Sequence, residues 1–306
     1  MDDATRRALR RRAREGELAN PYRNVYARRE YWSSLTPVDR MLHVARALTM
    51  LHPQWVFAGL AAASAHGLDH AWSLHNGRLS IAVSASYHGK ESRQPLDHVY
   101  MPTVEAVSAA GLRVTTVPRT LVDCGLRYPF EYALALFDSA LRNGCVTRDE
   151  VLAVCDGLIV DCGMVLRLLH YADARSENGG ESLIRGIAIM HGFVVPELQV
   201  SLVDPANPRA TCRVDFLWRL HDGRIIVLEY DGMAKYSDTE MTGGRTVRQT
   251  VYAEREREAA LRRAGVTTIL RVDYDEAVHV QPVVDKLLKA SVPMVDSRWT
   301  GATARR

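Results

Sequence analysis

The sequence predicts a mixed α/β protein in which amphipathic helices alternate with short apolar strands. Helical periodicity is clearest in residues 130–144, where apolar side chains recur every three or four positions up to a closing glycine. Strands are predicted where β-branched and apolar residues run together, as in residues 224–231 and 266–272. The chain of 306 residues is long enough for two or three domains. We expect a basic helix and wing-like hairpin in residues 1–50, a small α/β domain in 51–172, an α-β-β-β-α-β domain in 173–295 and a tail in 296–306.

Composition sets broad limits on function. The hydrophobic content of 47% and charged content of 25% are ordinary for a globular protein. The net charge is only +3, so an affinity for DNA has to come from the distribution of charge. We find no secretory signal, no apolar run long enough to cross a bilayer, and five cysteines without the paired spacing of a zinc site. We therefore expect a cytoplasmic protein with reduced cysteines and no membrane partner.

The first residues form a strongly basic segment. Residues 5–14 hold six arginines on a background that favours a helix. The turn residues Asn20-Pro21 and Asn24 follow between short apolar pieces, which predicts a hairpin. A basic helix followed by a hairpin is the pattern of a recognition helix and wing, here in a winged helix truncated before its recognition helix. We expect Arg10 and Arg14 to contact DNA phosphates, and a solvated arginine-rich tail stays open as the alternative.

The middle of the chain is predicted to form a compact α/β domain. An alanine-rich helix precedes strands expected at residues 79–86 and 98–103. Nothing in this segment has catalytic spacing. We interpret His66 and Arg119 as structural residues, because most buried polar side chains are satisfied by the fold around them.

The C-terminal third changes character. Its second and third strands are joined by a tight turn at Asp222-Gly223, and a long helix separates the third strand from the fourth. The predicted order is α-β-β-β-α-β, with a last helix after it. The elements are expected within residues 176–192, 193–203, 211–220, 224–231, 245–264, 266–272 and 275–289.

Four carboxylates stand out in this segment. Glu181 lies on the helix before the strands, and Asp215 interrupts the second strand. Glu229 and Asp231 share a face at the end of the third strand, because side chains two residues apart in a strand point the same way. Buried carboxylates that converge repel one another unless a cation lies between them. We therefore expect Mg²⁺ or Mn²⁺ to bind Asp215 and Glu229, with Glu181 in support.

The long helix after the third strand carries several arginines. Arg257 projects from the small-residue face that should pack on the sheet. Arg248 and Arg255 recur on another face and are candidates for contacts with the DNA backbone. The alternative is a solvated helix in which these arginines pair with neighbouring glutamates.

The C-terminal segment resembles the PD-(D/E)XK nuclease superfamily, and more closely the small domains related to the very-short-patch-repair (Vsr) endonuclease. The resemblance implies a restriction-endonuclease-like fold that hydrolyses phosphodiester bonds in DNA with magnesium. It covers roughly residues 175–290 and rests on six elements in order. These are Glu181-Ser182, Arg213-Val214-Asp215, Glu229-Tyr230-Asp231-Gly232, Lys235, Arg257-Glu258 and Gly265 before a strand.

One position departs from the superfamily's main pattern. A lysine usually stands two residues after the glutamate, and here Asp231 occupies that place. The Vsr-like branch also has aspartate there and takes a basic group from downstream, which makes Lys235 the candidate. The resemblance implies that Lys235 orients water or stabilises the phosphate and that Arg257 contacts the scissile phosphate.

The upstream segment resembles the AbiEi-type antitoxin proteins of bacterial abortive-infection systems. The resemblance rests on short motifs, "AAASAHGL" and "TVPRTLVDCG", within residues 61–125. It implies a winged helix before a small α/β domain, and a toxin protein as partner. Three functions stay open: a metal-dependent endonuclease, a catalytically silent DNA-binding antitoxin or transcriptional regulator, and a structural partner of another protein.

Overall fold

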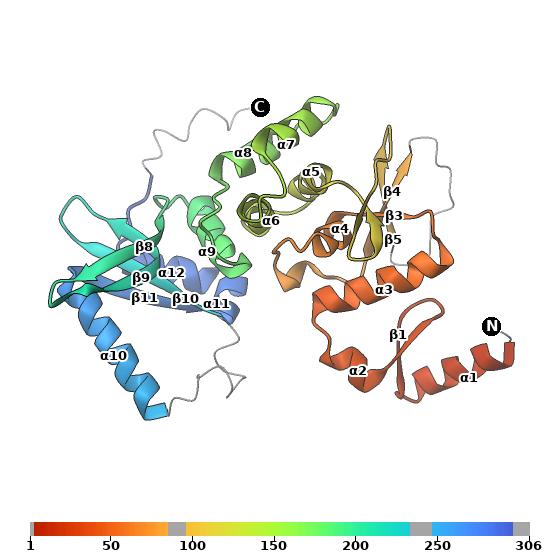
Figure 1. Cartoon of the computed structure of the whole chain (residues 1–306), viewed down its shortest axis with the longest axis horizontal. Coiled ribbons are helices and arrows are strands. Elements are labelled where there is room, and N and C mark those ends of the chain that lie inside the picture. The colour runs from red at the N-terminus through yellow and green to blue at the C-terminus, as the bar shows by residue number, and fades with distance from the viewer. Residues whose placement is uncertain (1–2, 85–95, 233–246, 296–306) are drawn as a thin grey trace. The chain divides into compact units, whose positions relative to one another are not determined.

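The computed structural model describes residues 3–84, 96–232 and 247–295, which form a mixed α/β structure with three sheets (Figure 1). Contacts divide the chain into two compact units. The N-terminal unit comprises Met1–Pro129 and Asn143–Ala172, and the C-terminal unit comprises Phe130–Arg142 and Asp173–Arg306. Over the described ranges, no helix combines the length and the apolar character needed to cross a membrane.

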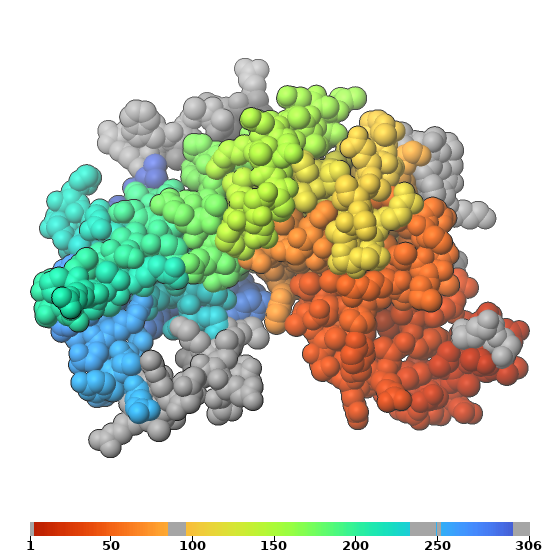
Figure 2. All heavy atoms as spheres, in the orientation of Figure 1, coloured from red at the N-terminus to blue at the C-terminus, as the bar shows by residue number. Residues whose placement is uncertain are grey.

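The N-terminal unit begins with the basic helix and hairpin that the sequence predicts. Helix α1 buries none of its residues and lies at the surface, where its atoms are red in Figure 2. The hairpin turns at Asn24, whose φ of 64° is left-handed, a conformation that asparagine tolerates better than most residues. The elements are α1 (Asp3–Arg14), β1 (Leu18–Tyr22), β2 (Val25–Arg28) and α2 (Arg29–Ser34).

A five-stranded sheet in the order β5-β4-β3-β7-β6 forms the rest of this unit, with helices around it. Leu48 of α3, Leu60 of α4 and Phe57 of β3 are buried together in its core. A capping box from Thr147 to Glu150 starts α7. The strands are β3 (Val56–Ala58), β4 (Leu79–Ser84), β5 (Leu96–Met101), β6 (Val107–Ala109) and β7 (Leu112–Val114), and the helices are α3 (Pro37–Leu51), α4 (Gly59–Ala65), η1 (Trp72–Leu74), α5 (Val117–Arg127), α7 (Arg148–Asp156) and α8 (Gly163–Tyr171).

The C-terminal unit is built on a four-stranded sheet in the order β11-β10-β9-β8. Strands β8, β9 and β10 are antiparallel neighbours, and β11 runs parallel to β10. The order of helices and strands from α9 to β11 is the predicted one. The elements are α9 (Gly179–Met190), β8 (Glu197–Asp204), β9 (Asn207–Arg219), β10 (Ile225–Asp231), α10 (Val247–Arg263), β11 (Val266–Asp273), α11 (Tyr274–His279) and α12 (Gln281–Lys289).

The two faces of this sheet bury different helices. Ile184 of α9 packs with Leu228 on one face, together with residues of α11 and α12. Leu261 of α10 packs with Val227 on the other face. Successive residues of a strand point to opposite faces, so Leu228 and Val227 divide the core as the pleat requires. Helix α9 therefore covers one face and α10 the other.

Helix α6 (Phe130–Arg142) belongs to the C-terminal unit, whereas the sequence analysis placed it within the middle domain. It packs on α9, where Asp138 and Arg185 form a fully buried ion pair at 2.6 Å. A buried charge is costly without its partner, so this pair ties α6 to α9. Local periodicity identifies α6 as a helix and carries no information about this distant partner.

Gly186 tests the close packing of α6 on α9. A Cβ added at Gly186 would lie 2.6 Å from the backbone Cα of Glu131, and the helix would have to move. We expect Gly186→Ala to lower the free energy of unfolding by about 1–3 kcal/mol, the usual cost of overpacking. Urea unfolding of the purified protein measures this change.

Gly157→Ala is the matched control. The Cβ added at Gly157 would lie 3.6 Å from the nearest atom, an ordinary contact, so we expect a change below about 0.5 kcal/mol. An alanine at position 186 that leaves stability unchanged, or raises it as alanine does in an open helix, would contradict the packing described for α6 and α9.

Candidate acidic site of the C-terminal unit

Asp215 stands at the point where β9 and β10 stop pairing. The last registered pair is Phe216 with Leu228, so Asp215 and Glu229 are neighbours just beyond it. One carboxylate oxygen of Asp215, Oδ2, accepts a hydrogen bond from the backbone N–H of Tyr230 at 2.9 Å. Asp215 is therefore held by the backbone of the adjacent strand.

Glu181 enters the site from the first turn of α9. Asn178 caps this helix by accepting from the backbone N–H of Glu181 at 3.0 Å, and its own amide donates to Glu181 Oε1 at 2.6 Å. The backbone N–H of Glu177 donates to Glu181 Oε2 at 2.8 Å. Only 3% of Glu181 is exposed to solvent. The helix start thus fixes a buried carboxylate beside the sheet.

The pKa of Glu181 is raised to about 7, chiefly because burial penalises the charged form. The negative charge of Asp215 raises this pKa further, while the hydrogen bonds from Glu177 and Gln199 oppose the rise. Near neutral pH the carboxyl group is therefore divided between its protonated and ionised forms. Perturbed carboxyl groups of this kind gather at functional sites.

Gln199 of β8 joins Glu181 to Asp215. Its Nε2 donates to Glu181 Oε2 at 3.1 Å and to Asp215 Oδ1 at 3.3 Å. No feature of the sequence singles out this residue. It is a polar residue between Leu198 and Val200, in a strand that also holds Glu197, Ser201 and Asp204.

Glu229 takes a different partner. It forms an ion pair with Arg257 of α10, and Arg257 also donates to the backbone carbonyl of Arg213 at 2.5 Å. Burial raises the pKa of Glu229, the bond from Arg257 opposes that rise, and the charges of Glu254 and Asp215 add to it. The arginine therefore offsets part of the cost of this half-buried carboxylate.

The sheet itself keeps Glu181 and Glu229 apart. Glu229 has the parity of Val227, which places it on the α10 face, where Arg257 reaches it. Glu181 comes from α9 on the opposite face. Asp215 lies between them, and its charge raises the pKa of both glutamates.

The remaining predicted residues lie outside this cluster or outside the described chain. Asp231 ends β10 opposite Asp273 of β11. Arg255 is exposed on α10. Lys235, like the side chain of Arg248, falls outside the residues that the structure describes.

The donor atoms suit a hard divalent cation, although their present arrangement is incomplete. Over the described residues, no three side chains of His, Cys, Asp or Glu are grouped to hold a metal ion. The separation of Glu229 from Glu181 by the sheet accounts for this. The oxygens of Glu181 and Asp215 nevertheless converge on one amide nitrogen of Gln199. Gln199 Oε1 is buried beside them, and no described group binds it. Carboxylate and amide oxygens are the ligands that Mg²⁺ and Mn²⁺ prefer, so the side chains of Glu181, Asp215 and Gln199 have the donor atoms that such an ion needs.

Helix α1 presents a second candidate surface, made of exposed arginines. Arg7, Arg10 and Arg14 follow one another at spacings of three and four, which places them on one helix face with Arg11. Arg11 of this face pairs with Glu15 at 3.8 Å, and elsewhere on the helix Arg6 and Arg12 form ion pairs with Asp3 at 3.1 Å and Glu17 at 2.7 Å. The predicted contacts Arg10 and Arg14 thus lie on an open cationic face, whereas the neighbouring ion pairs neutralise other arginines.

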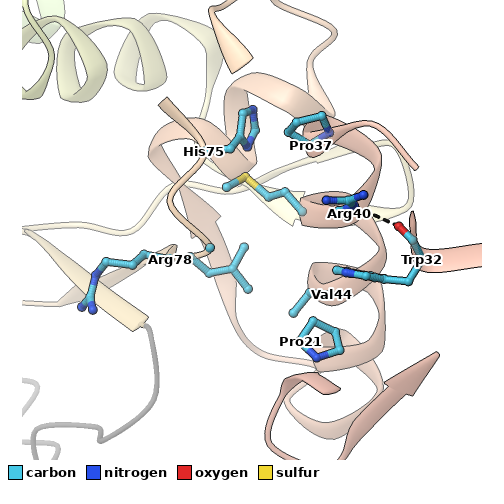
Figure 3. A pocket seen from close by; sticks show the side chains of 10 residues that line it. Pro21, Trp32, Pro37, Arg40, Val44, His75 and Arg78 are labelled. Atoms are coloured by element: carbon cyan, nitrogen blue, oxygen red, sulfur yellow. Dashed lines mark hydrogen bonds between the residues drawn. The ribbon is translucent and has the colours of Figure 1, made fainter. Parts of the chain in front are cut away.

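A cavity of about 220 Å³ opens in the N-terminal unit between α2, α3 and the start of β4 (Figure 3). Trp32, Val44, His75 and the side chain of Arg40 line it. The guanidinium of Arg40 donates to the backbone carbonyls of Trp32 at 2.9 Å and Ser33 at 3.0 Å. Arg40 therefore caps the C-terminal end of α2. We interpret the cavity as a gap in the packing between α2 and α3.

Comparisons with known proteins add relatives without an assigned activity. No family model and no solved structure matches the chain. The chain is similar to "Uncharacterized protein MT2308" and "Uncharacterized protein Rv2248", from two strains of Mycobacterium tuberculosis. Each is 34% identical over 109 residues, which is 35% of this chain. The match spans 40% of the length of each relative.

The ion pair of Arg257 with Glu229 predicts a pH-dependent stability. In Arg257→Met the pKa of Glu229 should rise further, because burial remains and the opposing cation is lost. When the pKa of a carboxyl group is higher in the folded than in the unfolded state, the protein loses stability as the pH rises from the unfolded-state pKa through the folded-state pKa. We expect a loss of about 1–3 kcal/mol at about pH 8 and a smaller loss at about pH 5, measured by urea unfolding.

Arg255→Met is the control, because Arg255 is exposed on the same helix. It should change stability by less than about 0.5 kcal/mol at either pH. Equal losses for Arg257→Met at both pH values would mean that Arg257 acts only through the carbonyl of Arg213.

Proposed function

We propose that the C-terminal unit is a metal-dependent DNA endonuclease of the PD-(D/E)XK type, with a Vsr-like, restriction-endonuclease-like fold. The observation that carries this proposal is the buried acid cluster, in which the charge of Asp215 acts on both Glu181 and Glu229. Like charges in a half-buried site destabilise the fold, and proteins retain them where function requires them. The order of elements from α9 to β11 also supports the proposal.

Asp215, Glu229 and Glu181 would hold Mg²⁺ or Mn²⁺ in this proposal. The bound ion would activate water and neutralise the charge that develops on the phosphate. Glu181 and Asp215 already face a common donor, so they are the residues best prepared to receive a cation. Arg257 would have to release Glu229 before it could contact a phosphate. Lys235 keeps the role that the family resemblance implies, and Asp231 stays a candidate catalytic residue.

A silent DNA-binding protein is the second candidate. The ion pair of Arg257 with Glu229 favours it, because Glu229, one of the proposed metal ligands, is already balanced by the positive charge of Arg257. Asp231 also stands where the main superfamily pattern has lysine. In this proposal the chain is a cytoplasmic antitoxin or transcriptional regulator of the AbiEi type with a toxin as partner.

Both candidates require DNA, and α1 supplies the surface we propose for it. Arg10 and Arg14 are exposed on the same face, free of the ion pairs that hold Arg6 and Arg12. Arg255 and Arg248 of α10 are proposed as further contacts with phosphates. Arginine suits this role because its planar guanidinium can bind phosphate oxygens in pairs.

Cleavage of DNA tests the enzyme proposal. We expect the protein to cut single- or double-stranded DNA with Mg²⁺ or Mn²⁺, and Asp215→Asn to lower the rate at least about a hundredfold, the scale of losing one well-placed electrostatic group. Asparagine retains an oxygen for the N–H of Tyr230, so the fold should survive. A gel assay with labelled DNA measures the rate.

Asp285→Asn, an exposed change on α12, is the control and should cut DNA as the unaltered protein does. Protein that is folded and binds DNA but never cuts it with either metal would exclude the enzyme and favour the regulator.

The salt dependence of DNA binding tests the role of α1. Each phosphate contact on duplex DNA contributes about −0.9 to the slope of log affinity against log salt. The double variant Arg10→Ala/Arg14→Ala should therefore bind more weakly and flatten that slope by about 1.8. Fluorescence anisotropy with a labelled duplex at several salt concentrations gives both quantities.

The double variant Arg6→Ala/Arg12→Ala is the control. It removes two positive charges, as Arg10→Ala/Arg14→Ala does, but these two arginines already form ion pairs with acidic residues. We expect it to flatten the slope less. If the two double variants behave alike, general charge rather than the Arg10–Arg14 face accounts for binding.

A further inference from the structure

Gln199 has a backbone conformation that a strand does not require. Its φ is 53°, in the left-handed region, although Leu198 and Val200 on either side pair regularly with β9. A residue with a side chain pays a steric penalty there, and such residues persist where the surrounding structure holds them. At this position the irregular backbone coincides with a side chain that reaches both Glu181 and Asp215.

The two halves of the carboxamide are unequally satisfied. The amino group of Gln199 donates hydrogen bonds to carboxyl oxygens of both Glu181 and Asp215. The carbonyl oxygen Oε1 then points away, and it is buried where no described group donates to it. A buried acceptor without a donor costs free energy, which calls for a physical reason.

We propose that Gln199 is a further ligand of the cation site: a half-turn of its carboxamide brings Oε1 towards a divalent cation held by Glu181 and Asp215. This inference rests on the metal site of the proposed function. The last torsion of a glutamine side chain is broad and nearly two-fold, so the turn meets little resistance. In the structure the amino group lies between the carboxyl groups of Glu181 and Asp215, and on cation binding the oxygen would take its place.

This exchange supplies what the acid cluster lacks. Glu229 is engaged by Arg257 on the other face of the sheet, so only two carboxylates converge near β8. Neutral amide oxygens are common ligands of hard divalent cations. Gln199 would provide a third oxygen from the same place without adding a third negative group beside the two carboxyl groups.

Binding of manganese chloride to the full chain, followed by electron paramagnetic resonance of free Mn²⁺, tests the inference. Gln199→Met removes both polar atoms, and Gln199→Glu keeps an oxygen and adds charge. Neither side chain branches at Cβ, so both keep the same backbone demand at φ 53°. Gln281→Met, an exposed glutamine on α12, is the matched control.

We expect Gln199→Met to weaken Mn²⁺ binding at least about tenfold, the usual scale for losing a group that supports a metal site. Gln199→Glu should bind Mn²⁺ at least as tightly as the unaltered protein, and Gln281→Met should bind as the unaltered protein does. Opposite responses to Met and Glu separate an oxygen ligand from a side chain that only fills space.

Equal affinity in the unaltered protein and both Gln199 variants, or a comparable loss in both Gln199 variants, would overturn the assignment of Gln199 and leave the metal site standing. An unaltered protein that binds no Mn²⁺ would overturn the inference together with the enzyme proposal. The expected binding pattern in a protein that never cuts DNA would support Gln199 and refute only catalysis.

Discussion

The acid cluster depends on the hydrogen bond between the carboxylate of Asp215 and the backbone N–H of Tyr230. Strands β9 and β10 stop pairing at Phe216 and Leu228, and the next N–H group needs another acceptor. The carboxylate of Asp215 is that acceptor, and the bond fixes this side chain where β9 and β10 stop pairing. Its second oxygen remains available to Gln199. One side chain thereby serves the fold and the site together.

The carboxyl groups near that bond repel one another, and hydrogen-bond donors of the protein reduce the repulsion. Arg257 balances Glu229 on one face of the sheet, while Gln199 separates Glu181 from Asp215 at the strand end. Neither arrangement restores the ordinary acidity of the two glutamates, because burial still raises both pKa values. We propose that a divalent cation able to displace these internal donors would relieve this cost.

Much of the local structure could be predicted from the sequence, because its causes lie within a few residues of each other. Strand β10 follows from its run of β-branched residues, and the start of α7 from the capping box that begins at Thr147. The hairpin β1–β2 follows only in part from the predicted turn residues, because it turns at Asn24 while Asn20 and Pro21 lie within β1. The candidate acids Glu181 and Asp215 could also be named, since charge stands out in an apolar element.

The remaining features depend on residues far apart in the chain. The link of α6 to α9 needs Asp138 to meet Arg185, 47 positions later. The ion pair of Glu229 with Arg257 likewise spans 28 positions and follows from which face of the sheet α10 covers. Gln199 owes its role to a backbone angle that no local pattern announces.

We propose that Glu181 and Asp215 share a divalent cation. A crystal of the full chain soaked in manganese chloride, measured at a wavelength where Mn²⁺ scatters anomalously, addresses it directly. The account predicts one strong anomalous peak between these two carboxylates, with an oxygen of Gln199 turned towards it. A map without a peak there, in which the amino group of Gln199 still bridges the two acids, would contradict it.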